Sequence, residues 1–124
     1  MRLLLDTQVV LWQLSGERSL SDPAQVAIGR ADDLLFSVVS FAEVGIKAAI
    51  GKLSVPDAFD ERVADAGLRT LALSAAHGLA VARLPVHHRD PFDRLLIAQA
   101  MIEDLTIVTS DRRFAQYEVP IVDA

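Results

Sequence analysis

DPFDRLLIAQAMIEDLTIVTSD, residues 90 to 111, joins the longest helical pattern of the chain to a short apolar strand. Asp90 followed by Pro91 is a typical helix start, and the helical apolar pattern continues to about residue 105. LTIVTS, at 105–110, is typical of a buried strand, and Asp111 ends it. This unit predicts an α/β fold with acidic residues at both ends of a helix–strand pair.

The same alternation extends along the whole chain. Apolar strands are expected at 2–6, 34–38, 68–73, 105–110 and 119–123, and helices at 7–14, 22–32, 40–53, 57–66, 74–84 and 90–105. Continuous apolar strands separated by helices predict a parallel sheet of about five strands, with helices on both faces. Because no repeat and no Pro/Gly-rich linker interrupts the pattern, we expect one domain spanning residues 1–124.

Composition narrows the class of protein. The 124 residues are 52% hydrophobic and carry a net charge of −5, so nucleic-acid binding would need a local basic surface. Cysteine is absent, which excludes disulfides and cysteine chemistry. Asp6 interrupts the N-terminal apolar run, and no apolar stretch approaches the roughly 20 residues that span a bilayer. We therefore expect a soluble cytoplasmic protein without a membrane segment.

Four acids occupy special positions in this pattern, although each also has a purely structural explanation. Asp6 and Asp111 end strands and would cap the turns that follow. Ser40 and Glu43 have the spacing of a capping box, in which each side chain binds a backbone N–H at the helix start. Asp93 falls in the first turn of its helix, where a carboxylate interacts favourably with the helix dipole.

Taken together, the acids predict a shared site. Asp6 and Asp111 end strands while Glu43 and Asp93 open helices that follow strands, so all four can meet at one rim of the sheet. Carboxylates gathered this closely repel one another, which raises their pKa values or requires a divalent cation. Oxygen-only ligands favour Mg²⁺ or Mn²⁺ over Zn²⁺.

Four short motifs carry a family resemblance: LLLDT, SFAE, DRLLIAQA and TSDRRF occur in this order. They resemble the pattern of PIN-domain proteins and, more narrowly, of VapC ribonuclease toxins from toxin–antitoxin pairs, and the resemblance extends over nearly the whole chain. It implies a five-stranded parallel sheet, cleavage of RNA with Mg²⁺ or Mn²⁺, homodimers, and inhibition by a VapB-type antitoxin.

The resemblance also implies roles for individual residues. Asp6 and Asp93 would bind the metal directly, and Glu43 and Asp111 would do so directly or through water. Three hydroxyl residues beside these acids would orient the ligands: Thr7, Ser40 and Ser110. Two departures stand out. Gln8 replaces a histidine common in relatives, and Asp90 is an additional acid that fits the pattern less well than Asp93.

We therefore hypothesise an endoribonuclease that hydrolyses RNA phosphodiester bonds with metal-activated water. Basic residues beside the acidic motifs are candidate phosphate contacts, or alternatively ordinary surface charges: Arg89, Arg94, Arg112, Arg113 and Lys47. Neither His87 nor His88 matches an acidic position of the pattern, and we assign them no ligand role.

Two other readings remain open at this point. One is a PIN-like module that binds RNA or an antitoxin without cutting. The other is a phosphatase similar to the haloacid dehalogenase group, which also places an aspartate after the first strand. That group needs a second aspartate two residues later, where this chain has Gln8.

Overall fold

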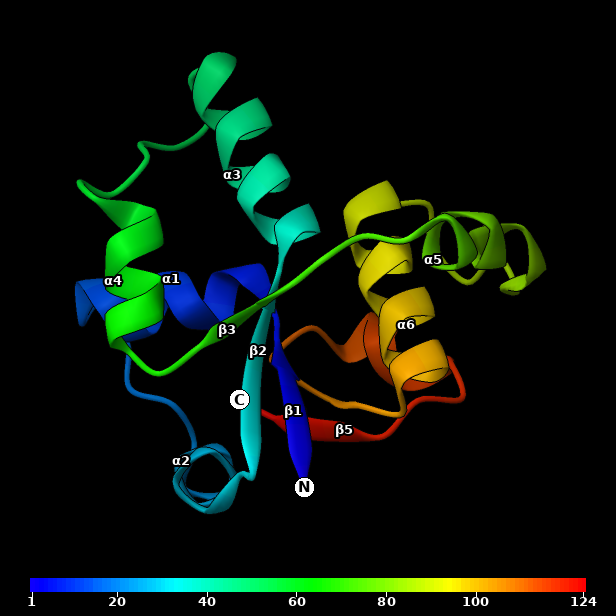
Figure 1. Ribbon diagram of the computed structural model, residues 1–124, viewed down its shortest axis with the longest axis horizontal. Coiled ribbons are helices and arrows are strands. Elements are labelled where there is room, and N and C mark those ends of the chain that lie inside the picture. Colours follow the sequence, from blue (N-terminus) through cyan, green and yellow to red (C-terminus); the bar gives the residue numbers. More distant parts are fainter.

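The computed structural model describes residues 1–124 and has three layers, with a central sheet between two groups of helices (Figure 1). All strand pairs are parallel, and the order across the sheet is β3-β2-β1-β4-β5. The strands are β1 (Arg2–Leu5), β2 (Asp33–Ser37), β3 (Arg69–Leu71), β4 (Thr106–Thr109) and β5 (Ile121–Asp123). The prediction of a five-stranded parallel sheet is confirmed.

Six α-helices and two short 3₁₀ turns connect these strands. They are α1 (Thr7–Ser15), α2 (Asp22–Arg30), α3 (Val38–Ala49), α4 (Phe59–Asp65), α5 (Ala75–Ala80), η1 (Val81–Arg83), α6 (Pro91–Glu103) and η2 (Arg112–Gln116). Each expected helix is present, and most boundaries differ from the predicted ones by one to three residues. Asp90 caps α6 by accepting from the backbone N–H of Asp93, as the sequence predicted.

Both faces of the sheet are buried, because alternate strand residues point in opposite directions. Leu4, Leu35 and Ile107 belong to the core under α5, α6 and η2. Their neighbours Leu3, Phe36 and Val108 belong to the other core, under α1, α2 and α4. This two-sided burial explains why the strands are continuous apolar runs rather than alternating patterns. No helix combines the length and apolar character that crossing a membrane requires.

The start of α3 corrects one prediction. The helix begins at Val38, directly after β2, and Ser37 is its cap, since the Ser37 hydroxyl accepts from the Val39 backbone N–H. Ser40 therefore lies within the first turn and does not form the expected capping box with Glu43. The earlier start leaves Ser40 and Glu43 on an established helix, with both side chains buried.

Strand order places a topological switch point between β1 and β4. From β1 the chain proceeds through β2 to β3 on one side, whereas β4 and β5 lie on the other side. At such a point the connections leave in opposite directions and open a crevice beyond the carboxyl ends of the strands. Asp6 follows β1 and Asp111 lies two residues beyond β4, so both acids are at this crevice.

Candidate active site

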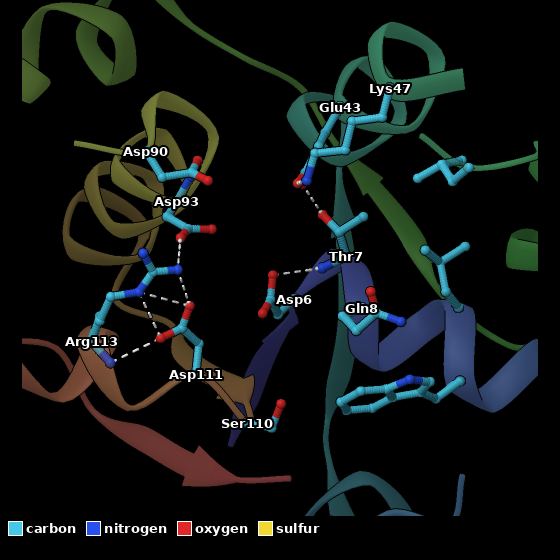
Figure 2. A pocket seen from close by; sticks show the side chains of 13 residues that line it. Asp6, Thr7, Gln8, Glu43, Lys47, Asp90, Asp93, Ser110, Asp111 and Arg113 are labelled. Carbon is cyan, nitrogen blue, oxygen red and sulfur yellow. Dashed lines mark hydrogen bonds and ion pairs between the residues drawn. The ribbon is translucent and has the colours of Figure 1, made fainter. Parts of the chain in front are cut away.

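The four predicted acids meet in one cavity of about 350 Å³ at the switch point. Figure 2 shows Asp6 at its floor, Glu43 on one wall, and Asp93 with Asp111 on the opposite wall. The remaining polar lining residues are Thr7, Gln8, Lys47, Asp90, Ser110 and Arg113. The convergence expected from the sequence therefore exists in the structure, with Asp90 as a fifth acid at the edge.

Asp6 is fixed by both neighbouring elements. Its Oδ1 accepts from the Thr7 backbone N–H at 2.8 Å, so it caps α1, and its Oδ2 accepts from the Thr109 hydroxyl at 2.8 Å. The Thr109 hydroxyl also accepts from the Asp111 backbone N–H at 3.0 Å. Thr109, which the sequence reasoning did not select, thus links the acid after β1 to the acid after β4.

Glu43 is held by a hydroxyl and an ammonium group. Its Oε1 accepts from the Thr7 hydroxyl at 2.7 Å, and the Ser40 hydroxyl lies 2.7 Å from the same Thr7 oxygen. Lys47, one helical turn further along α3, forms an ion pair with Oε2. The hydrogen bond to Glu43 raises the pKa of Lys47, which keeps this ammonium charged. Thr7 and Ser40 therefore occupy the orienting positions that the resemblance implied.

A guanidinium group covers the acids on the opposite wall. Arg113 donates to both oxygens of Asp111, with Nη2 2.6 Å from Oδ2, and its Nη2 also lies 3.7 Å from Oδ2 of Asp93. These contacts hold the pKa of Asp111 below its usual range. The Arg113 side chain is 53% exposed, so it lines the cavity at its solvent-exposed edge.

The two most buried carboxyls have strongly raised pKa values. Burial, followed by the charges of Asp93 and Glu43, raises the pKa of Asp6 to about 7, although the hydrogen bond from Thr109 opposes the shift. Burial and the charges of Asp90, Asp111 and Glu43 raise the pKa of Asp93 to about 7. Negative charge in this cavity is therefore only partly compensated by the two neighbouring cations.

The donor set suits a hard divalent cation, but the side chains do not form a closed metal centre. Carboxylate and hydroxyl oxygens are the ligands that Mg²⁺ and Mn²⁺ prefer, and the uncompensated charge of Asp6 and Asp93 favours a cation between them. However, no three acidic or histidine side chains are grouped closely enough to hold an ion. Two of the acids are paired with Arg113 and Lys47 instead.

The predicted phosphate contacts separate into three groups. Arg113 and Lys47 line the cavity. Arg89 and Arg112 are exposed next to the acidic segments but do not line it. Arg94 is buried and donates to the carbonyl oxygens of Pro85, Val81 and Leu84 and to the Tyr117 hydroxyl, so the prediction of a phosphate contact at Arg94 is corrected.

Sequence reasoning also missed the position of a histidine. His88 lies between the cavity wall and the protein interior, with Nε2 3.1 Å from Oδ2 of Asp93. Burial and the charge of Arg113 lower the pKa of His88. The contact with Asp93 could not be anticipated from local patterns, because His88 reaches Asp93 around the bend that precedes α6. Ser110 lines the cavity as expected, without a hydrogen bond to any of the acids.

Comparison with known proteins agrees with the fold. The family model of the PIN domain matches residues 3–120. The chain therefore belongs to the PIN-domain family. Among curated proteins, Ribonuclease VapC22 of Mycobacterium tuberculosis (strain ATCC 25618 / H37Rv) is 33% identical over 126 aligned positions, which cover 95% of this chain and 93% of that protein.

Solved structures share the same fold. VapBC2 from Rickettsia felis, bound to a DNA fragment from the promoter, matches with a TM-score of 0.72 at 15% identity, over 99% of this chain and 98% of that one. VapBC-5 from Mycobacterium tuberculosis, a member of the VapBC family of toxin–antitoxin systems, matches with a TM-score of 0.66 at 22% identity, over the full length of both chains.

Proposed function

We propose that this protein is a metal-dependent endoribonuclease, the toxin of a VapBC-type toxin–antitoxin pair, and that it hydrolyses RNA phosphodiester bonds. The observation that carries the proposal is the cavity at the switch point, where four carboxylates from separate elements meet and two have pKa values raised to about 7. The similarity to Ribonuclease VapC22 supports RNA as the substrate. We propose that the protein acts in the cytoplasm, where its RNA substrate would be found.

We assign Asp6 and Asp93 as direct ligands of Mg²⁺ or Mn²⁺, because they are the buried carboxylates whose charge is least compensated. Glu43 and Asp111 would join them directly or through water. When bound there, the cation supplies charge neutralisation for the phosphodiester and lowers the pKa of a water molecule. Thr7, Ser40 and Thr109 keep Asp6 and Glu43 in fixed orientations through their hydroxyl groups.

Glu43 is the acid best placed to accept a proton from the attacking water. It lies on the wall opposite Asp93 and Asp111, where Thr7 and Lys47 hold its carboxylate (Figure 2). Asp111 is a poor base, because Arg113 holds its pKa below the usual range. A general base must lie within hydrogen-bond reach of the reacting water, which this wall of the cavity allows.

The RNA strand has a path away from the acids. A second cavity of about 610 Å³ shares Gln8, Leu11, Lys47 and Leu53 with the first, so one cleft continues between α1 and α3. Lys47 stands at the junction, and Lys52 lies farther along. We propose that phosphates beside the cleaved bond contact these lysines, and that Arg89, Arg112 and a displaced Arg113 contact RNA on the other side.

The direct test is RNA cleavage by the purified chain, freed of any co-purifying protein, with Mn²⁺ or Mg²⁺. We expect cleavage that a chelator abolishes and that Asp6→Asn reduces by more than about a hundredfold, since even residues that only support metal ligands commonly cost 10- to 100-fold. Asp60→Asn, which alters an exposed acid of α4, is the matched control and should cleave normally. Cleavage that survives the chelator or Asp6→Asn would contradict the assignment, and RNA binding without cleavage would favour the non-catalytic module.

We also propose a VapB-type antitoxin as partner and a homodimer as the assembly. The similar solved structures include VapBC complexes. Several large apolar side chains are exposed and offer contact area for another protein, including Ile46 and Ile50 of α3, Leu79 of α5, and Val86. Co-expression with a candidate VapB-type antitoxin, followed by mass determination in solution, tests both points. A monomer that captures no such protein would contradict them.

A further inference from the structure

His88 connects the acidic cavity to the protein interior. Its side chain is only 6% exposed and lies between Asp93 and Tyr117. The ring Nε2 is 3.1 Å from Oδ2 of Asp93, and the ring Nδ1 is 2.9 Å from the Tyr117 hydroxyl. His88 does not line the cavity itself. It therefore contacts Asp93, a proposed metal ligand, from the side away from the cavity.

The direction of these hydrogen bonds follows from their partners. The Tyr117 hydroxyl accepts from Nη1 of Arg94 at 3.1 Å and from the His88 backbone N–H at 3.4 Å, which leaves its single proton free to donate. An ionised Asp93 carboxylate can only accept. The neutral ring of His88 must then carry its proton on Nε2, donate it to Asp93, and accept from Tyr117 at Nδ1. A continuous series of hydrogen bonds thus runs from Arg94 through Tyr117 and His88 to Asp93, each group donating to the next.

We infer that His88 is a positioning residue: its Nε2–H holds Oδ2 of Asp93 and leaves Oδ1 directed into the cavity. Oδ1 of Asp93 makes no hydrogen bond within the protein, and Figure 2 shows the carboxylate oxygen remote from Arg113 directed toward the space that Asp93 shares with Asp6. Groups that hydrogen-bond to metal ligands in this way fix the ligand orientation and commonly change metal affinity by 10- to 100-fold. The inference rests on the metal site proposed above.

If His88 only stabilised the fold by packing, its substitution would be expected to have different effects. The ring also packs against Phe114 and Tyr117, so its loss removes packing as well as a hydrogen bond. Glutamine separates the two effects, because its side-chain amide N–H can reach the position of Nε2 while its shape differs from the ring. His87 is the matched control, since it also packs on Tyr117 but is exposed and makes no contact with an acid.

The experiment measures Mn²⁺ affinity of the full chain by titration calorimetry, without RNA, for His88→Ala, His88→Gln and His87→Ala. We expect the dissociation constant to rise about tenfold or more for His88→Ala, by less than about threefold for His88→Gln, and not at all for His87→Ala. Unchanged affinity in folded His88→Ala, or an equal loss for Gln and Ala, would overturn the inference.

Nitrogen NMR of the metal-free wild-type chain at pH 8 supplies an independent reading, even if His88→Ala does not fold. The inference requires the proton on Nε2 of His88, and a proton on Nδ1 would overturn it. Absence of Mn²⁺ binding in the wild-type chain would overturn the metal site and this inference together. Normal Mn²⁺ binding with no dependence on residue 88 would overturn this inference alone.

Discussion

Arg113 places a cation of the chain itself beside the acids that are proposed to bind the metal. It pairs with Asp111 through both carboxylate oxygens and approaches Asp93, yet about half of its side chain is exposed. An ion pair this exposed contributes little to stability, typically about 0.2–1 kcal/mol. Arg113 can therefore neutralise the acids in the metal-free protein and be displaced at small cost.

Removing Arg113 should tighten metal binding. In Arg113→Ala the incoming cation no longer competes with the guanidinium for Asp111, and we expect the Mn²⁺ dissociation constant to fall about threefold to fivefold, the equivalent of roughly 0.6–1 kcal/mol. Titration calorimetry without RNA measures this change. Arg112→Ala removes the neighbouring exposed arginine, which makes no ion pair, and should leave the affinity unchanged. Weaker binding in Arg113→Ala would show that Arg113 supports the site instead.

The contrast between Arg113 and Arg94 shows what a list of charged residues cannot predict. Asp93 and Arg94 are consecutive on α6, so their side chains project about 100° apart around the helix axis. Once Asp93 faces the cavity, Arg94 must face elsewhere, and it points to the carbonyl groups before the helix. Helix phase was available from the sequence and excludes Arg94 from the site, whereas the position of Arg113 depends on the turn after β4.

The β2–α3 junction sets the position of Glu43. The strand passes into the helix without a loop, and the fully buried Ser37 both caps α3 and donates to Oε1 of Gln99 at 2.5 Å. Gln99 lies on α6, the helix that carries Asp93. This hydrogen bond therefore ties together the two helices whose acids face each other across the cavity.

Ser37→Ala should destabilise the protein without removing any proposed ligand. The helix loses its cap and the buried Gln99 oxygen loses its donor, so we expect the free energy of unfolding to fall by about 2 kcal/mol. Denaturant titration measures this loss. Ser19→Ala, at an exposed serine without side-chain hydrogen bonds, is the control and should change the free energy of unfolding by less than about 0.5 kcal/mol. An equal effect of both variants would contradict the role assigned to Ser37.

Most elements could be predicted because the apolar pattern reports burial directly. Runs such as LLL and LTIVT show no alternation of apolar and charged residues, which indicates a strand covered on both faces of the sheet. The start of α3 could not be predicted in this way, because Ser37 and Ser40 are both reasonable helix caps from the sequence alone. Which serine begins the helix depends on how far β2 pairs with its neighbours, and β2 extends to Ser37 opposite Leu71 of β3.

The gathering of the acids was predictable, but Thr109 and His88, which bind two of them, were not. Asp6 and Asp111 follow strands and Asp93 lies in the first turn of α6, and these positions are visible in the sequence. Glu43 lies in the second turn of α3, one turn later than the sequence indicated. Thr109 and His88 bind the acids across distances of 103 and 5 residues, in directions set by sheet pairing and by the bend before α6. The residue beside an acid in sequence, such as Ser110, is not the one whose hydroxyl reaches it.

The cavity as a whole makes the metal-free protein sensitive to pH. The pKa values of Asp6 and Asp93 are raised from 3.8 to about 7, so between these values the folded chain binds more protons than the unfolded chain. Stability from these two groups is fully present below about pH 4 and is lost as the pH rises through about 7. A divalent cation should reverse this loss, because it stabilises the ionised carboxylates.

Thermal unfolding with a chelator, measured between about pH 4.5 and 8.5, tests this sensitivity against Asp6→Asn. The variant lacks one of the two titrating groups, so the difference in melting temperature between variant and wild type should move in favour of the variant as the pH rises. We expect a relative change on the order of 5 °C. Mn²⁺ should raise the melting temperature of the wild type more at pH 8 than at pH 5. Parallel curves for the two chains would contradict the raised pKa of Asp6.

The pairing of β1 with β4 has a consequence for when the chain becomes active during synthesis. β1 is made before β4, one of its two partner strands, which begins at Thr106 and is followed by Asp111 and Arg113. Until Thr109 and Asp111 have been synthesised, Asp6 has neither the hydroxyl that holds it nor the opposing wall of the cavity. The acidic cavity can therefore form only after β4 and the residues that follow it have been made, and a partner protein then has the complete surface to recognise.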